Sequence, residues 1–218
     1  MKKGISPDEA AKLIPDGAVV MIGGFLSVGG PHRIIDALVA AGRRNLTVIA
    51  NDTARPGSGI GKLITADAVS HLIVTHIGTN PETQKAMNEG KIKVDLVPQG
   101  TMAERIRAGG FGLGGVLTKT ALGTIAAEGK KIIEIDGENW LYEKPLKADF
   151  ALIAADRADH MGNLAYQLTA TNFNPVMATA AKTVICEPRE IIPVGVIPPD
   201  HVTTPGVLVD HLIRRNSL

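Results

Sequence analysis

Three groups of residues in this chain have side-chain types and spacing suited to ligand binding or catalysis. The first is the glycine-dense stretch GGFLSVGGP at 23–31. Glycine permits positive φ angles and close approach of the backbone, so the bare amides of such a loop can contact a substrate, and the start of the following helix can meet an anion. A tight structural turn is the alternative interpretation. The stretch is not a phosphate-binding Walker loop, because Gly30 and Pro31 stand where Lys and Ser or Thr are required.

The other two groups are polar residues at the ends of expected strands. Asn51 and Asp52 end the run LTVIAND, and Gln99 follows the run KVDLVP. A glutamine amide offers two N–H donors without a charge, which suits the stabilisation of a developing oxyanion. The alternative interpretation of Gln99 is a side-chain amide that caps a turn or a helix.

A second glycine stretch, GSGIGK at 57–62, also lacks the Walker spacing, and we expect it to be a surface turn.

Other catalytic and metal-binding patterns are missing from the sequence. The six histidines have no metal-ligand spacing, and His71 and His76 are expected on opposite faces of one strand. No serine or cysteine elbow accompanies them, so a hydrolase triad is unsupported. The single cysteine, Cys186, cannot form an internal disulfide and is expected to be a small buried side chain in a reducing compartment.

Strand-like and helix-like segments alternate along the chain, and they predict the elements that would position these residues. We expect helices at 6–14, 31–42 and 80–90, buried strands at 18–22, 46–52, 71–76, 93–99, 150–156 and 183–188, and a hairpin around 137–138. This order favours an α/β fold with a largely parallel central sheet flanked by helices. In such folds ligands bind at the carboxyl ends of the strands. No linker or repeat divides the chain, so we expect one domain over residues 1–218.

Composition narrows the possible partners. Apolar residues make up 44% of the 218-residue chain, which is enough to bury a sizeable core. The formal charge is +1 and aromatic residues are only 3%, so nucleic acid is not an expected partner. The longest uncharged apolar and glycine stretch, 18–30, is too short for a membrane helix, and acidic residues near the N-terminus argue against a signal peptide. We expect a soluble, cytoplasmic protein without a membrane partner.

Taken together, the motifs resemble those of the α subunit of family I coenzyme A-transferases. The similar segments are DGAVVMIGGFLSVGGP (16–31), NDT (51–53), IGTNPET (77–83), PQGTMAERIRAGG (98–110), NFNP (172–175) and TPGVLVDH (204–211). They follow the family's order and span residues 4–213, with the acetate/acetoacetate and butyrate/acetoacetate transferases looking most similar. The resemblance implies a fold that is shared with sugar-phosphate isomerases.

The resemblance also implies an activity and a partner. Such enzymes move CoA between a short-chain acyl-CoA and a free carboxylic acid by a ping-pong route through a glutamyl-CoA thioester. The nucleophilic glutamate lies in a Ser-Glu-Asn-Gly type motif of the β subunit, and no such tetrapeptide occurs here, since GENW at 137–140 lacks the glycine. We therefore expect a heterodimer or larger assembly such as α2β2, no metal or permanent cofactor, and no activity from this chain alone.

Site residues follow from the same resemblance. Gln99 matches an oxyanion-stabilising glutamine, and Asn51 matches a position near the pantetheine arm of CoA. The stretch assigned to CoA comprises Gly23, Gly24, Phe25, Leu26, Ser27, Val28 and Gly29.

Two alternative functions stay open: a sugar-phosphate isomerase and a non-catalytic acyl-CoA-sensing module. The isomerase would need phosphate-binding cations, for which Lys62, Arg105 and Arg107 are the candidates, although a solvated face is the plainer interpretation of all three. The sequence does not say which acyl donor and acceptor acid are used.

Overall fold

The computed structural model describes residue 2 and residues 4–214, so the extreme ends of the expected domain, residues 1, 3 and 215–218, lie outside the described residues. The elements follow one another in the order β1 (Gly4–Ile5), α1 (Pro7–Leu13), β2 (Val19–Ile22), α2 (His32–Ala40), β3 (Leu46–Asp52), α3 (Gly61–Thr65), β4 (Val69–His76), α4 (Pro81–Asn88), β5 (Lys93–Leu96), α5 (Gln99–Gly110), β6 (Val116–Thr118), β7 (Ile132–Ile135), β8 (Glu138–Glu143), β9 (Ala148–Asp159), β10 (Leu164–Ala165), α6 (Asn174–Met177), β11 (Ala181–Ile192) and β12 (His211–Ile213).

The central sheet is almost entirely parallel. Among the described residues it has nine strands, in the order β1-β12-β11-β9-β2-β3-β4-β5, with β10 paired to β9. Only the β10 and β9 pair is antiparallel. Ile22 at the end of β2 pairs with Ala50 of β3, and Asp52 pairs with His76 of β4. The loop after β2 and the end of β3 therefore meet at the carboxyl edge of the sheet, as the predicted α/β fold requires.

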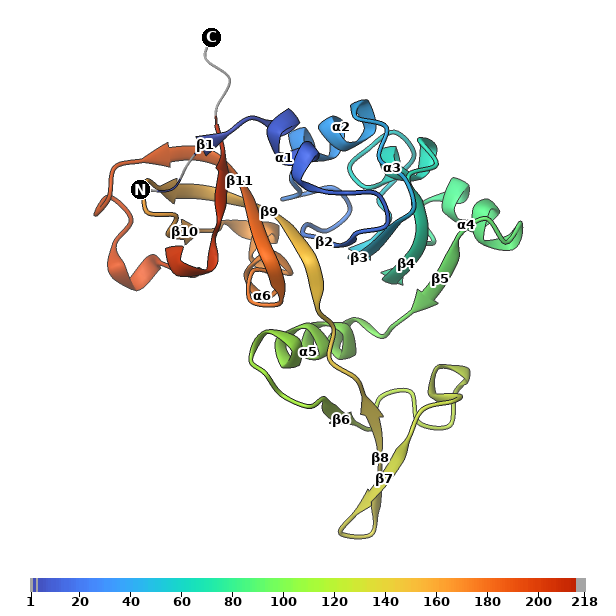
Figure 1. The fold of residues 1–218 in the computed structure, drawn as a ribbon. Helices are drawn as coiled ribbons and strands as arrows, with labels where there is room; N and C mark the ends of the chain where they lie inside the picture. Colours follow the sequence, from blue (N-terminus) through green and yellow to red (C-terminus); the bar gives the residue numbers. More distant parts are fainter. Residues whose placement is uncertain (1, 3, 215–218) are drawn as a thin grey trace.

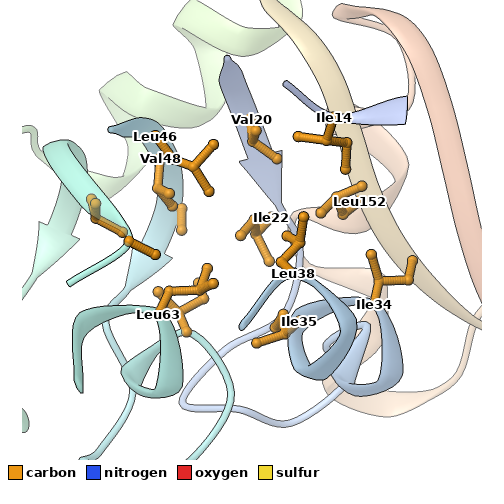
Figure 2. Close-up of a cluster of buried hydrophobic side chains, with 14 of the residues drawn as sticks. Ile14, Val20, Ile22, Ile34, Ile35, Leu38, Leu46, Val48, Leu63 and Leu152 are labelled. Atoms are coloured by element: carbon orange, nitrogen blue, oxygen red, sulfur yellow. The ribbon is translucent and has the colours of Figure 1, made fainter. Parts of the chain in front are cut away.

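Helices cover both faces of this sheet (Figure 1). On one face, Val20 and Ile22 of β2 belong to a buried cluster with Leu38 of α2 and Leu63 of α3, shown in Figure 2. Their neighbour Met21 belongs to a second cluster on the other face, which includes side chains of α5 and α6. Successive side chains of a strand point to opposite faces, so a continuous apolar run such as VVMI is what a doubly covered strand needs.

The helix boundaries follow the local signals in the sequence. Ser6 accepts a hydrogen bond from the Glu9 amide at 3.1 Å, and the Glu9 carboxylate accepts one from the Ser6 amide at 2.7 Å, which forms a capping box. Gly42, with φ +66°, donates its amide to Val39 and ends α2 in the left-handed conformation expected of a C′ glycine. These two predicted boundaries are confirmed.

A smaller, antiparallel sheet of β6, β8 and β7 projects from the main body beyond α5 (Figure 1). The predicted hairpin is confirmed, although its turn lies at Asp136-Gly137, one residue earlier than expected. Both turn residues have positive φ, as a two-residue hairpin turn requires. Glu138 and Asn139 of the GENW segment are exposed, and Glu138 forms an ion pair with Lys119 at 2.8 Å.

In the part of the chain that the structure describes, no helix combines the length and the apolar character needed to cross a bilayer.

Candidate functional site

The loop after β2 is a miniature hairpin. The Phe25 amide donates to the Val28 carbonyl at 2.9 Å, and the Val28 amide donates back to the Phe25 carbonyl at 2.8 Å. Leu26 and Ser27 form the turn between them, with φ angles of +47° and +72°. This is the conformation of a tight two-residue turn, and it holds the apolar side chains of Leu26 and Val28 out of the core, where both are exposed.

Asn174 fixes the base of this loop. Its side chain is fully buried, and its Nδ2 donates to the carbonyls of Gly29 at 3.0 Å and Ala170 at 2.9 Å. Its Oδ1 accepts the amide of Ala154 at 2.9 Å. A Cβ at Gly23 would collide with that same Oδ1. The glycine and the asparagine lie 151 positions apart, and no local sequence signal predicted this role for Asn174.

Only some of the loop amides are available to a ligand. The amides of Gly23, Phe25, Leu26 and Val28 donate to acceptors within the chain. Among the described residues, no acceptor is found for the amides of Gly24, Ser27 and Gly29. Four amides of the loop are therefore used in holding its conformation, which fits a structural turn, and three are left without an acceptor in the described residues, so binding through these amides stays a prediction.

The N-terminus of α2 is already occupied, so the expectation that it could receive an external anion is wrong. Its N-cap residue, Pro31, provides no side-chain hydrogen bond. Instead the Glu187 carboxylate, from β11, accepts the amides of Arg33 at 3.0 Å and Ile34 at 3.1 Å. A carboxylate of the chain itself thus satisfies the free amides of the first turn, where negative charge is favoured.

The second glycine stretch is not the surface turn that we expected. Gly59 and Gly61 are both buried, and Ser58 Oγ donates to Ser27 Oγ at 2.9 Å. A Cβ at Gly59 would lie 2.7 Å from Ser27 Oγ. The glycines are needed because this segment packs directly against the loop after β2, a contact between distant positions that composition alone does not reveal.

The predicted polar residues come together at the carboxyl edge. Gln99 Nε2 donates to Asn51 Oδ1 at 2.5 Å, and Asn51 Nδ2 donates to Asp52 Oδ2 at 2.7 Å. The same Asp52 oxygen accepts the Leu26 amide at 2.8 Å. A continuous set of hydrogen bonds therefore joins the glycine loop to Gln99. The side chain of Gln99 contacts another side chain rather than capping the backbone, and Pro98 is the N-cap of α5.

Accessibility differs within this set. Gln99 is exposed at the first position of α5, whereas Asn51 and Asp52 are each only 3% exposed. Gln99 is therefore the member that a ligand can reach directly. The predicted contact of Asn51 with CoA stays a prediction, since its Oδ1 already accepts from Gln99.

A cleft of about 470 Å³ borders the loop on its other side, towards β9 and β11. Gly29 and Gly30 form one wall, Ala154 and Ala155 line it, and charged side chains surround it. The buried Asp156 carboxylate is paired there with Arg189 at 2.7 Å. The loop after β2 thus borders this cleft and is also hydrogen-bonded, through Asp52 and Asn51, to Gln99.

The basic residues considered for a phosphate site do not form one. Lys62 pairs with Asp36 and Arg107 pairs with Glu104 at 3.1 Å, both as partly exposed ion pairs. Arg105 is not on a solvated face as expected. Its side chain is 15% exposed and lies 3.7 Å from Glu143, and burial lowers the pKa of its guanidinium while Glu143 opposes that change. In the described part of the chain, no group of three or more metal-ligating side chains comes together.

A family model for coenzyme A transferase matches residues 5–215. This chain belongs to the coenzyme A transferase family. Among curated proteins it is 51% identical over 205 residues to the acetate CoA-transferase subunit alpha of Escherichia coli K12, with 94% of this chain and 93% of that protein covered. It is 50% identical over 199 residues to the acetoacetyl-CoA:acetate/butyrate CoA transferase alpha subunit of Clostridium acetobutylicum, with 91% of each covered. The predicted relationship to CoA-transferase α subunits is confirmed.

A solved CoA transferase has the same fold. An acyl-CoA transferase of Escherichia coli O157:H7, crystallised as a thioester complex with CoA, matches with a TM-score of 0.87 at 23% identity. The match covers all of this chain and 48% of that one, so this chain spans about half the length of the solved relative. The likeness supports the predicted CoA-transferase fold at a level of identity where it says nothing further about substrates.

Proposed function

We propose that this chain is the α subunit of a two-subunit CoA-transferase that exchanges CoA between a short-chain acyl-CoA and a free carboxylic acid. Its family membership and its similarity to acetate and acetoacetyl-CoA:acetate/butyrate transferase subunits support this substrate class. Acetyl-, butyryl- and acetoacetyl-CoA are the candidate donors. The observation that carries the proposal is the hydrogen-bonded set that joins an exposed Gln99 to a loop with free amides.

The reaction starts with a nucleophilic carboxylate on the partner subunit. That carboxylate attacks the thioester carbonyl to give a tetrahedral oxyanion, which collapses with cleavage of the C–S bond, so that CoA leaves as a thiolate and a mixed anhydride remains. The thiolate then attacks the glutamyl carbonyl and releases the acyl group as a carboxylate, which leaves a glutamyl-CoA thioester. A second carboxylate reverses these steps and takes the CoA. The free N–H of Gln99 would donate to the oxyanion, and the free loop amides would contact CoA.

The carboxylates of this chain that lie beside the loop support a nucleophile from elsewhere. Asp52 is buried and accepts three N–H donors. Glu187 caps α2 and pairs with Arg33 at 3.2 Å, and Asp156 pairs with Arg189. A nucleophile must be uncommitted, and all three carboxylates are engaged: Asp52 is also buried, whereas Glu187 and Asp156 line the cleft but are held in ion pairs with arginine side chains. These commitments support our proposal that a β subunit supplies the attacking group.

Co-expression tests the proposal. The chain produced with a β subunit is expected to exchange acyl groups between acetoacetyl-CoA and acetate or butyrate, with parallel lines in double-reciprocal plots as ping-pong kinetics require. The chain purified alone is expected to show no exchange. Robust exchange by the isolated chain would contradict the divided active site.

A further inference from the structure

Asp52, the last residue of β3, accepts more hydrogen bonds than a local turn requires. Its carboxylate is 3% exposed and accepts hydrogen bonds from the Leu26 amide at 2.8 Å and the Ala54 amide at 2.7 Å. It also accepts one from Asn51 Nδ2 at 2.7 Å. The Ala54 contact alone would complete a local turn. The other two reach the glycine loop and the Asn51 side chain.

An ionised carboxylate can only accept hydrogen bonds, and this fixes the direction of every bond that follows. Asn51 must turn its Nδ2 towards Asp52, so its Oδ1 faces the other way. Gln99 must then present its nitrogen to that oxygen, as the contact of 2.5 Å shows. One N–H of Gln99 is consumed in this contact, and the second N–H of the same nitrogen is left in a defined position.

We propose that Asp52 is a positioning residue that sets the amide orientation of Asn51 and, through it, the place of the donor that Gln99 offers to the oxyanion. The inference rests on the proposed function, because it concerns the same site. It adds a residue that touches neither CoA nor the acyl group and acts only through its two amide neighbours.

The substitution Asp52→Asn tests this directly because it keeps the size of the side chain and removes one acceptor. With its oxygen kept on the Ala54 amide, the new side chain would turn an NH2 group towards Asn51 and also towards the Leu26 amide, which would lose its acceptor. Asn51 would then present its oxygen to position 52 and its nitrogen to Gln99. The Gln99 amide would flip in response, so that its oxygen faces Asn51 and its NH2 group takes the position that the oxygen held before. The free N–H donor of Gln99 is thereby displaced. A displacement of about 1 Å at a catalytic group can cost about 10² in rate.

The matched control is Asp159→Asn. Asp159 is 2% exposed and accepts the amides of Met161 at 2.8 Å and Asn163 at 3.0 Å, together with the Asn163 side chain at 2.8 Å. It therefore has the same burial and the same kinds of donor as Asp52, at a place outside the site. Both variants are expected to lower the thermal midpoint of the α–β complex by similar amounts, because each leaves a buried donor unsatisfied.

Turnover separates the two variants. In the complex with a β subunit, Asp52→Asn is expected to lower kcat by about 10- to 100-fold, whereas Asp159→Asn leaves kcat within about twofold of the parent. Combined with Gln99→Ala, Asp52→Asn should lower kcat by less than about threefold more, because the residue it acts through is gone. If the fold-losses in kcat of the two single variants simply multiply in the double variant, the role of Asp52 is overturned while the function of Gln99 stands.

A second variant covers the case in which Asp52→Asn does not fold. Asn51→Ala leaves Asp52 with both backbone donors and removes the side chain that links Asp52 to Gln99, together with the contact that Thr75 Oγ1 makes with Asn51 Oδ1 at 3.2 Å. It is therefore expected to lower kcat by a similar factor, again without adding to Gln99→Ala. An unchanged kcat in Asn51→Ala would overturn the proposal. An unchanged kcat in Gln99→Ala alone would overturn the oxyanion function itself and the role of Asp52 with it.

Discussion

Asn174 occupies the space that a side chain at position 23 would need. A Cβ at Gly23 would lie far closer to Asn174 Oδ1 than van der Waals contact allows, and that oxygen is held in place by the Ala154 amide. The end of β2 and the short helix α6 are therefore matched to each other, and the glycine is required by packing rather than by its φ angle.

This relationship predicts the effect of Gly23→Ala. We expect a loss of about 1–3 kcal/mol in the free energy of unfolding, because a buried methyl group would have to displace a fixed side chain. Gly17→Ala is the control, since Gly17 has φ +78° but nothing within 4 Å of its Cβ position. That variant is expected to lose only about 1 kcal/mol. Thermal unfolding of the α–β complex measures both, and a smaller loss for Gly23→Ala would contradict the packing argument.

Gln99→Ala is expected to lower kcat of the assembled enzyme by about 10² to 10³, the usual consequence of losing one oxyanion donor. The KM for acyl-CoA should change little, because the interaction is made with a charge that develops in the transition state. Gln84→Ala serves as the control, since Gln84 donates to the carbonyls of Ile77 and Gly78 and is not part of the proposed site. Equal turnover in Gln99→Ala and the parent complex would exclude the assignment.

Gly24→Ala tests whether the loop binds CoA. Gly24 has φ +110°, and an added Cβ would lie 3.1 Å from the backbone of Gly30. The substitution should shift the free Gly24 amide and raise the KM for acyl-CoA by about tenfold, which corresponds to about 1.4 kcal/mol. Gly42→Ala, at φ +66° with open space around it, should cost stability without changing KM. An unchanged KM in a folded Gly24→Ala complex would leave the loop with a structural role only.

Cys186 is expected to resist alkylation in the native protein. It lies fully buried on β11, and burial raises the pKa of its thiol, with the neighbouring Glu187 acting in the same direction. The thiolate is the reactive form, so iodoacetamide should label this chain only after unfolding in urea. The mass of the chain before and after treatment provides the measurement. Rapid labelling under native conditions would show that β11 is exposed.

Much of the fold was predictable because it follows from local patterns. The capping box of Ser6 and Glu9 and the glycine at 42 mark helix ends, and the apolar run of β2 predicts a strand covered on both faces. The short strands β1 and β12 were not predicted. Each has at most three residues, and their pairing with each other joins opposite ends of the chain.

The residues of the candidate site could be selected from the sequence, but the hydrogen bonds that join them could not be predicted. Gln99 and Asn51 were singled out from their types and their places at strand ends. The roles of Asp52 and Asn174 depend on contacts with Leu26 and Gly23, which lie far away in the sequence. The same is true of Gly59, because its burial against the loop after β2 exists only in the folded chain.

We infer that this chain supplies hydrogen-bond donors to the active site while a partner subunit supplies the attacking carboxylate. Mass spectrometry of the α–β complex after incubation with acetoacetyl-CoA tests it most directly, since a thioester-linked CoA adds a defined mass to one peptide. We predict the adduct on a glutamate of the β subunit and none on this chain. An adduct on a glutamate within these 218 residues would contradict the account.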